Sequence, residues 1–149
     1  MSSYRPGVVK QSEETSWHLQ DTDFISSTLG WALGYPRWDQ ATRSYTGTII
    51  QTEDGGASWI AQAAGVSELL RAVGFVDANH GWAVGFNGTI LHTTDGGDRW
   101  HRQTVPTGDE FRDVVFADVD TGWATSLRPV NYDWQGRADN WEAAVWHTD

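Results

Sequence analysis

Hydrophobic and polar residues alternate in short runs along this chain, and the clearest runs lie between residues 70 and 105. Alternation with a period of two, in runs rich in aromatic and β-branched residues, is typical of half-buried β-strands. It predicts four strands, A to D, at residues 70–76, 81–86, 89–93 and 100–105. The turns between them contain Asn87-Gly88 and Asp95-Gly96-Gly97, residues that accept the positive φ of tight hairpins. We therefore predict an antiparallel four-stranded unit here.

The same features recur along the chain. Gly-Trp pairs stand at 30/31, 81/82 and 122/123. A turn motif, Thr-x-Asp-Gly-Gly-x-x-Trp, runs from 52 to 59 and from 93 to 100, with a degraded copy at 12–17. The closing tryptophans are 59 − 17 = 42 and 100 − 59 = 41 residues apart. A period near forty residues, made of short strands, is the length of a four-stranded blade of a β-propeller.

The predicted fold class is therefore all-β, with β-propeller-type four-stranded blades, about three of them in this chain. We place the blades at residues 20–63, 69–105 and 112–149, with a strand remnant at 8–19, in a single domain over 1–149. The final residues, 147–149, align with 93–95 and stop before the Gly-Gly step. The chain is then a partial propeller, or half of a six-bladed ring in which each copy closes the other, or a piece of a longer protein.

Charge and composition narrow the class of partner. The chain has 20 acidic and 10 basic residues and a formal net charge of −10, which argues against binding to nucleic-acid phosphates. The first residues contain no hydrophobic signal core, and no apolar run approaches a membrane span. The protein is then cytoplasmic, or an export signal has been removed. The absence of cysteine excludes disulfides and thiolate metal sites.

The repeat accounts for most of the aromatic and acidic motifs as structure. Of ten tryptophans, six occupy repeat positions and are predicted to pack between strands and blades: Trp31, Trp82, Trp123, Trp17, Trp59 and Trp100. The Asp-box turns are interpreted as structural, with the carboxylate accepting backbone hydrogen bonds, at Asp54, Gly55, Gly56, Trp59, Asp95, Gly96, Gly97 and Trp100. The acidic A–B turns at 77–81 and 118–122 resemble half of a calcium loop but lack its remaining ligands. We expect no metal and no cofactor.

Two insertions break the repeat between strands B and C, at residues 34–47 and 127–142, and we predict that both are loops. Both contain the residue types that dominate binding hot spots, and we predict partner binding by Tyr35, Arg37, Trp38, Arg43, Arg128, Tyr132, Trp134, Arg137 and Trp141. Arg71 and Arg112 occupy equivalent positions, four residues before the strand A phenylalanine, where the first blade has Gln20. In a propeller these arginines and both insertions share one face. Alternatively, the insertions fold onto themselves through Arg–Asp pairs.

The motif from Phe75 to Trp100 resembles the photosystem II stability and assembly factor repeats of the Ycf48/Hcf136-like propellers, within the wider BNR or Asp-box group. The resemblance covers nearly all of the chain outside the insertions. It implies a non-enzymatic propeller whose arginine-lined face holds a protein partner, in photosynthetic members a photosystem II reaction-centre subunit during assembly. Arg71 and Arg112 are the corresponding positions here. It also implies an exported, periplasmic or lumenal location if a signal was removed.

The leading hypothesis is a binding or assembly module for a protein or peptide, including a membrane-protein assembly intermediate. The alternatives are a carbohydrate-binding module, a sialidase-like Asp-box fragment, and a structural fragment without activity of its own. A sialidase would need an acid, a nucleophile and arginines around the channel, for which the candidates are Glu110, Asp113 and Tyr132.

Overall fold

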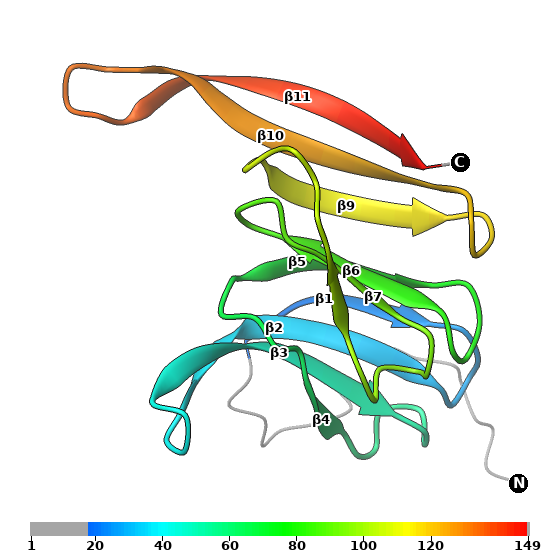
Figure 1. Cartoon of the computed structure of the whole chain (residues 1–149). Helices are drawn as coiled ribbons and strands as arrows, with labels where there is room; N and C mark the ends of the chain where they lie inside the picture. The colour runs from blue at the N-terminus through cyan, green and yellow to red at the C-terminus, as the bar shows by residue number, and fades with distance from the viewer. Residues whose placement is uncertain (1–17, 149) are drawn as a thin grey trace, which may run out of the picture.

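The computed structural model describes residues 18–148, which fold into eleven β-strands in three antiparallel sheets (Figure 1). The first sheet has the order β1 (Leu19–Phe24), β2 (Gly30–Asp39), β3 (Ser44–Thr52) and β4 (Ile60–Ala63). The second consists of β5 (Leu70–Phe75), β6 (Gly81–Gly85), β7 (Ile90–Thr93) and β8 (His101–Gln103). The third has three strands, β9 (Glu110–Phe116), β10 (Gly122–Tyr132) and β11 (Ala138–Thr148). The predicted all-β class is confirmed.

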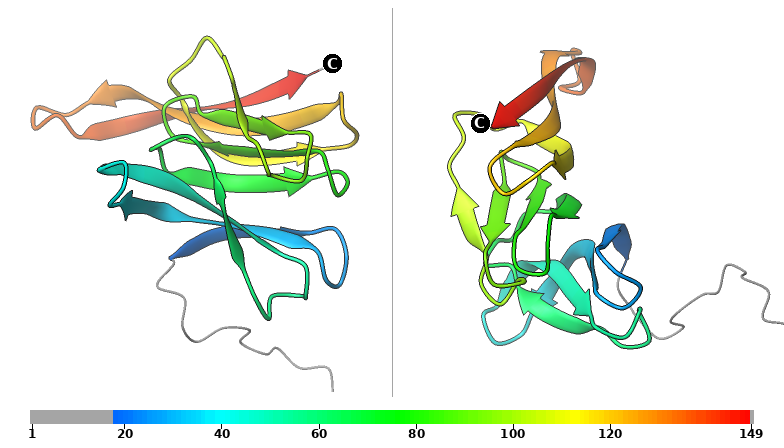
Figure 2. Two further views of the ribbon diagram at one scale, coloured as in Figure 1. Left: turned by 60° about the horizontal axis from the view of Figure 1, so that its bottom comes forward. Right: turned by 90° about the vertical axis from the view of Figure 1, so that its right-hand side faces the viewer.

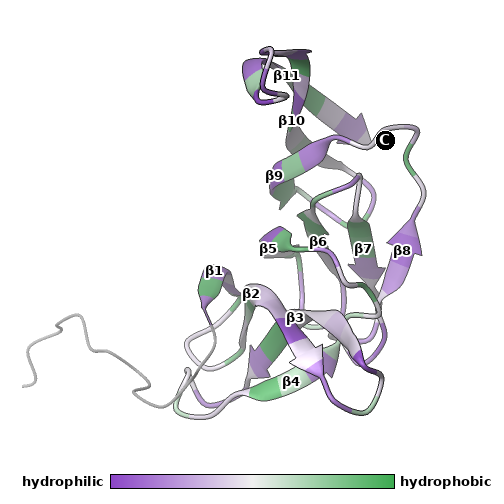
Figure 3. Ribbon diagram, turned by 90° about the vertical axis from the view of Figure 1, so that its left-hand side faces the viewer, coloured by the Kyte–Doolittle hydropathy of each residue, from purple (hydrophilic) through white to green (hydrophobic). Residues whose placement is uncertain are grey.

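The sheets stack as consecutive propeller blades. β1 contacts β5, and β5 contacts β9, so the first strands of the three sheets run next to one another. Figure 3 shows these strands along one edge of the stack, with the hydrophilic β8 at the opposite, outer edge. The views in Figure 2 show the same succession of sheets from two other sides. Within residues 18–148, no helix is long and apolar enough to cross a membrane.

The Gly-Trp motif is explained by the packing of one aromatic ring between two sheets. Phe75 at the end of β5 lies directly over Gly81, where an added Cβ would come within 2.5 Å of three ring carbons. The other face of the Phe75 ring stacks on Trp31 of the preceding sheet, with centroids 3.5 Å apart and planes 6° apart. The glycine of each Gly-Trp pair is therefore required beneath the phenylalanine ring of its own sheet. The tryptophan that follows it in the sequence covers the phenylalanine of the next sheet.

The second junction repeats the first. Trp82 stacks on Phe116 at 3.5 Å and 7°, and Phe116 lies over Gly122. Trp31 and Trp82 are buried, as predicted, and the hydrophobic core consists of one cluster at each junction. Trp123 is different: its side chain is 39% exposed, because no further sheet follows it among the described residues.

The Asp-box turns are built alike. The Thr52 hydroxyl donates to Asp54 Oδ1 at 2.8 Å and accepts from the Gly56 amide at 2.8 Å. The Ser58 amide and hydroxyl also donate to the Asp54 carboxylate, at 2.8 and 2.6 Å. These bonds lower the pKa of Asp54 from 3.8 to about 2, the Ser58 hydroxyl contributing most. Both oxygens of the Asp54 carboxylate therefore accept hydrogen bonds from residues of its own turn.

The second Asp-box has the same pattern and also joins two sheets. The Thr93 hydroxyl donates to Asp95 Oδ1 at 2.9 Å, and Gly96 and Gly97 have φ of 72° and 99°. The Gly96 carbonyl accepts a hydrogen bond from Trp31 Nε1 of the preceding sheet at 3.0 Å. The turn therefore contributes to blade packing as well as to its own hairpin.

Three details differ from the sequence-based prediction. The insertions are not loops: they extend β2–β3 and β10–β11 as paired strands, because their Tyr, Trp and Thr residues favour strand structure. Leu19 belongs to β1, where it pairs with Gly34, and residues 8–17 of the predicted remnant lie outside the described residues. The C-terminal alignment was one residue out of register, since Thr148 pairs with Gly122 as Thr93 pairs with Gly81.

Candidate functional site

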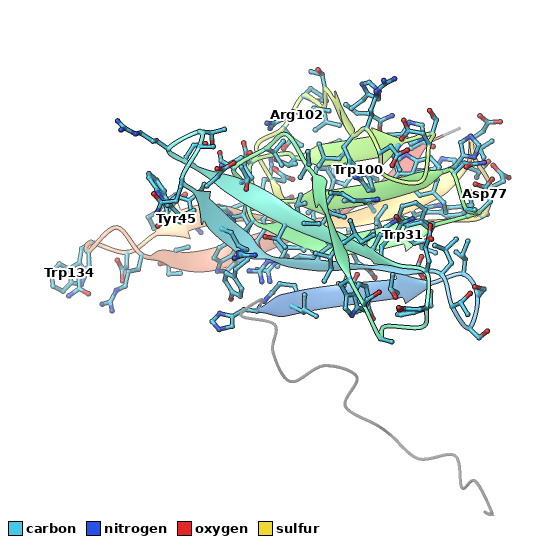
Figure 4. The ribbon with its side chains drawn as sticks, turned by 90° about the horizontal axis from the view of Figure 1, so that it is seen from below. Trp31, Tyr45, Asp77, Trp100, Arg102 and Trp134 are labelled. Carbon is cyan, nitrogen blue, oxygen red and sulfur yellow. The ribbon has the colours of Figure 1, made fainter. Side chains whose placement is uncertain are left out.

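Two hairpin arms project from the same side of the stack. We call residues 35–47 of β2–β3 the first arm and residues 127–142 of β10–β11 the second arm. Both point to the left in Figure 1, and Figure 4 shows Tyr45 and Trp134 at that end with Asp77 at the opposite end. β1, β5 and β9 all begin on the side of the arms. The arms and the starts of these strands together form what we call the arm face.

Arg71 and Arg112 are each displayed by a β-bulge at the start of an inner strand. The pairing of β5 with β6 skips Arg71, between Leu70 and Ala72, and the pairing of β9 with β10 skips Arg112. β1 has the same irregularity at Gln20. A bulge residue lies outside the regular ladder, and bulges commonly redirect a side chain. The equivalence inferred from sequence thus corresponds to one repeated backbone feature.

Glu110 holds the two arginines together. Its Oε1 lies 2.9 Å from Arg71 Nε and 3.0 Å from Arg112 Nε, and its Oε2 accepts from Arg112 at 3.1 Å. Arg71 also donates to Gln20 Oε1 at 3.0 Å, and its guanidinium lies 4.9 Å from the ring centroid of Phe86. The cluster carries two positive charges and one negative charge, so a net positive charge remains at a site whose Arg112 side chain is 41% exposed.

The first arm presents aromatic surface. Trp38 and Tyr45 face each other across the hairpin in an edge-to-face pair with centroids 5.3 Å apart, and both are more than half exposed. Tyr35 forms a similar pair with His18 at 6.0 Å. Arg43 lies in the turn with a φ of 52°, and the turn is held by Asp39 Oδ1, which accepts from two backbone amides. An open hollow borders this arm, lined in part by Arg37 and Trp38.

The second arm is held by ion pairs across its own strands. Arg128 donates to Glu142 through Nε at 2.8 Å, and this carboxylate raises the pKa of Arg128. Arg137 lies 3.3 Å from Asp133 in the terminal turn. This agrees with the alternative in which the insertions fold onto themselves, as far as these two arginines are concerned. The aromatic residues of the arm remain available: Tyr132 is 61% and Trp134 90% exposed, and Trp141 is also exposed.

The residues considered for a sialidase do not come together. Both carboxylate oxygens of Glu110 are engaged by arginines, while Asp113, on the same strand, lies on the exposed face of the third sheet. Tyr132 pairs with Ala138 at the far end of β10, seven residues from Thr125, the partner of Asp113. Seven residues of strand span about 23 Å. Among residues 18–148 there is also no group of three or more His, Asp or Glu side chains placed to hold a metal ion.

Comparison with known proteins identifies the family. Residues 62–145 match the family described as photosynthesis system II assembly factor YCF48. The match covers 145 − 62 + 1 = 84 of the 149 residues, more than half of the chain. The chain belongs to this family. No curated protein matches it significantly by sequence.

A solved YCF48 structure also resembles this fold. The structure, titled "YCF48 bound to D1 peptide", aligns with a TM-score of 0.60 and 26% sequence identity over 87% of this chain. The chain spans 41% of the length of that protein. The YCF48-like propeller fold expected from the Phe75–Trp100 motif is therefore confirmed, and the family is one of assembly factors.

Glu110 and Phe86 are the members of the arginine cluster that the sequence did not predict as part of a binding site. From the sequence, Glu110 has a place only in the sialidase alternative, and Phe86 has a place only at the end of a predicted strand. A signal for Glu110 was present: it lies two residues before Arg112, on the same strand. Its contact with Arg71 of the neighbouring sheet could not be foreseen from spacing along the chain.

Proposed function

We propose that this chain is a non-enzymatic binding module that holds a protein or peptide partner on the arm face, with Arg71 and Arg112 receiving a carboxylate of the partner. The observation that carries the proposal is the pair of bulge-displayed arginines around a single carboxylate, between two aromatic arms. Membership of an assembly-factor family and the likeness to YCF48 bound to a D1 peptide support a peptide as the partner.

The chemistry of the cluster favours an acidic group over a neutral one. Glu110 orients both guanidinium groups but neutralises only one of them, so a second carboxylate can still form charge-assisted hydrogen bonds. The guanidinium fork of Arg112 is exposed enough to be reached from solvent. The formal net charge of the whole chain, −10, opposes acidic partners in general, which confines productive contact to this positively charged position.

The aromatic side chains of the arms would supply the apolar part of the interface. Tyr45 and Trp134 present broad exposed rings at the rim of the arm face (Figure 4), and the exposed ring of Trp38 packs against that of Tyr45. Tyrosine and tryptophan give large contact areas with little loss of conformational entropy, which suits recognition of an extended peptide. A membrane-protein segment awaiting assembly is a partner of this kind.

The test is a peptide-binding titration by fluorescence anisotropy. The probes are overlapping labelled peptides tiling a D1 sequence, each prepared with a free C-terminal carboxylate and as the amide. Removing one charge-assisted hydrogen bond costs about 1.5–3 kcal/mol. We therefore expect Arg71→Gln and Arg112→Gln each to weaken binding of the best peptide by about 10- to 150-fold. Affinity should also fall with added salt.

The matched control is Arg99→Gln. Arg99 lies in the Asp-box turn at the other end of the sheet, where its backbone amide donates a hydrogen bond to Asp95. The Arg99→Gln variant should bind the peptide with the affinity of the wild type. Equal binding by all three variants would refute the arginine site. Loss of binding in Trp38→Ala and Trp134→Ala, with the arginine variants unaffected, would move the contact to the arms.

Carbohydrate binding stays a prediction with one favourable observation, the high exposure of Tyr132 and Trp134. Rings exposed in this way can stack on sugar faces. A glycan array with the same variants separates the two functions: binding to glycans that needs Trp134 but not Arg112 would favour the carbohydrate alternative.

A further inference from the structure

The two ends of the sheet stack carry complementary halves of the contact that joins neighbouring sheets. We call the surface of the third sheet that faces away from the second the forward face, and the surface of the first sheet on the opposite side the rear face. Among residues 18–148, no sheet covers either face. Neither face belongs to the arm face, which lies on the side of the stack from which the two arms project (Figure 1).

The contact itself is defined at the junction of the first two sheets. The Trp31 ring stacks on Phe75 at 3.5 Å, and Trp31 Nε1 donates to the Gly96 carbonyl at 3.0 Å. Asp21 Oδ2 accepts a hydrogen bond from the Val73 amide at 3.0 Å. The tryptophan and the carboxylate come from the preceding sheet, and the phenylalanine, the carbonyl and the amide come from the following one.

The forward face has the first half of this set. Trp123 pairs with the neighbouring strands as Trp31 does, and Asp113 occupies the strand position of Asp21. Trp123 is 39% exposed and borders a hollow that Asp113 also lines. Val115 and Val145 add apolar surface, at 59% and 73% exposure.

The rear face has the second half. Phe24 ends β1 as Phe75 ends β5, and it lies over Gly30 as Phe75 lies over Gly81. The Thr22 amide is two residues before Phe24, and the Gly55 carbonyl is in the Asp-box, at the positions of Val73 and Gly96. Phe24 is 43% exposed, whereas Phe75 is covered by Trp31.

We propose that the forward face of one chain binds the rear face of a second copy of this chain, with Trp123 stacking on the second copy's Phe24. Trp123 Nε1 then donates to the Gly55 carbonyl, and Asp113 accepts from the Thr22 amide. The contact is heterologous, so two copies joined at both ends form a closed ring of six sheets. The second copy is preferred as occupant because each end presents the groups that the other lacks.

The test begins with the molar mass of the 149-residue chain, measured by size-exclusion chromatography with light scattering over a hundredfold range of concentration. We expect a species of twice 16.6 kDa. Trp123→Ala and Phe24→Ala should each remove the dimer, and Trp134→Ala, on the second arm, should retain it. A wild-type monomer at every concentration, or a Phe24→Ala protein as dimeric as the wild type, would overturn the proposal.

Mixing the two variants tests the direction of the contact. A pair made of one Trp123→Ala chain and one Phe24→Ala chain retains one intact contact, so the mixture should recover dimer that neither variant forms alone. A face that bound itself would give no such recovery, which would refute the head-to-tail arrangement.

A crosslinking experiment keeps the proposal testable if an alanine variant fails to fold. The chain has no cysteine, so Thr22→Cys and Asp113→Cys introduce unique thiols on the rear and forward faces. With a short bis-maleimide, a mixture of the two variants should give a covalent dimer in high yield, and either variant alone should give little. Equal yields in all three samples would contradict the proposal.

Discussion

Replacing Gly81 with alanine tests whether Phe75 is trapped between two sheets. The new Cβ would meet three atoms of the Phe75 ring at 2.5 Å, and the ring cannot retreat because Trp31 stacks on its other face at 3.5 Å. Overpacking of a core costs about 1–3 kcal/mol, and loss of an aromatic pair adds about 0.5–1.5 kcal/mol. We expect Gly81→Ala to lower the free energy of unfolding by about 2–4 kcal/mol.

Two other glycines provide controls for this prediction. Gly30→Ala creates the same 2.5 Å overlap with Phe24, but Phe24 is 43% exposed and can turn into solvent. Its cost should therefore be near 1 kcal/mol or less, roughly the lower limit of overpacking. Gly108 has open space around its Cβ position and no positive φ, so Gly108→Ala should be neutral or stabilising by about 0.5 kcal/mol.

The assay is urea unfolding followed by far-ultraviolet circular dichroism, at a protein concentration where the chain is monomeric. With a slope of about 2 kcal/mol per molar urea, Gly81→Ala should lower the midpoint by about 1–2 M and Gly30→Ala by about 0.5 M or less. If Gly81→Ala unfolds at the same midpoint as Gly108→Ala, the ring is not trapped. If Gly30→Ala costs as much as Gly81→Ala, the effect does not come from Trp31.

Three further outcomes follow from the same structure. Trp82→Ala removes a buried ring stacked on Phe116 at 3.5 Å and should cost about 3–5 kcal/mol, lowering the calorimetric melting temperature by about 10 °C; an unchanged melting temperature would contradict its placement. The pKa of Asp54 is about 2 in the folded chain and 3.8 in the unfolded chain, so its contribution to stability is present above pH 3.8 and is lost as the pH falls toward 2. Asp54→Asn should therefore reduce the dependence of stability on pH in this acidic range, measured by unfolding at a series of pH values. Burial lowers the pKa of His92 below 6.5, so on acidification the imidazole becomes protonated in the unfolded chain before it does in the folded chain, and stability falls as the pH drops through 6.5. His92→Gln should therefore reduce the difference between the urea midpoints measured at about pH 8 and about pH 5.5.

Most of the fold could be predicted because its determinants are local and repeated. The Asn87-Gly88 and Asp95-Gly96 turns fix hairpins through backbone conformation, and the period of forty residues identifies the blade. The strands of the second sheet therefore lie close to their predicted positions. The prediction that the first and second arms are loops was wrong, because it rested on the length of the insertions alone. Residues such as Tyr35 and Thr46 favour strand structure.

The candidate site was harder to predict because its contacts cross between sheets. The sequence showed that Arg71 and Arg112 are equivalent, which is a statement about position. It could not show that Glu110 would bridge them, since that depends on how closely two strands approach. In the same way, the burial of Trp31 and the exposure of Trp123 follow from the presence or absence of a neighbouring sheet, although both residues occupy the same position in the motif.

The bulges at Gln20, Arg71 and Arg112 separate the positions proposed to contact a partner from the residues that hold the sheets together. In each inner strand, one residue is excluded from the ladder, and regular pairing resumes after it. Mutation at such a position changes the chemistry of the arm face and leaves the interlocking aromatic rings untouched. Duplication of a blade therefore adds one more bulge position, whose residue can vary independently of the packing residues. New partner specificities can then evolve one blade at a time.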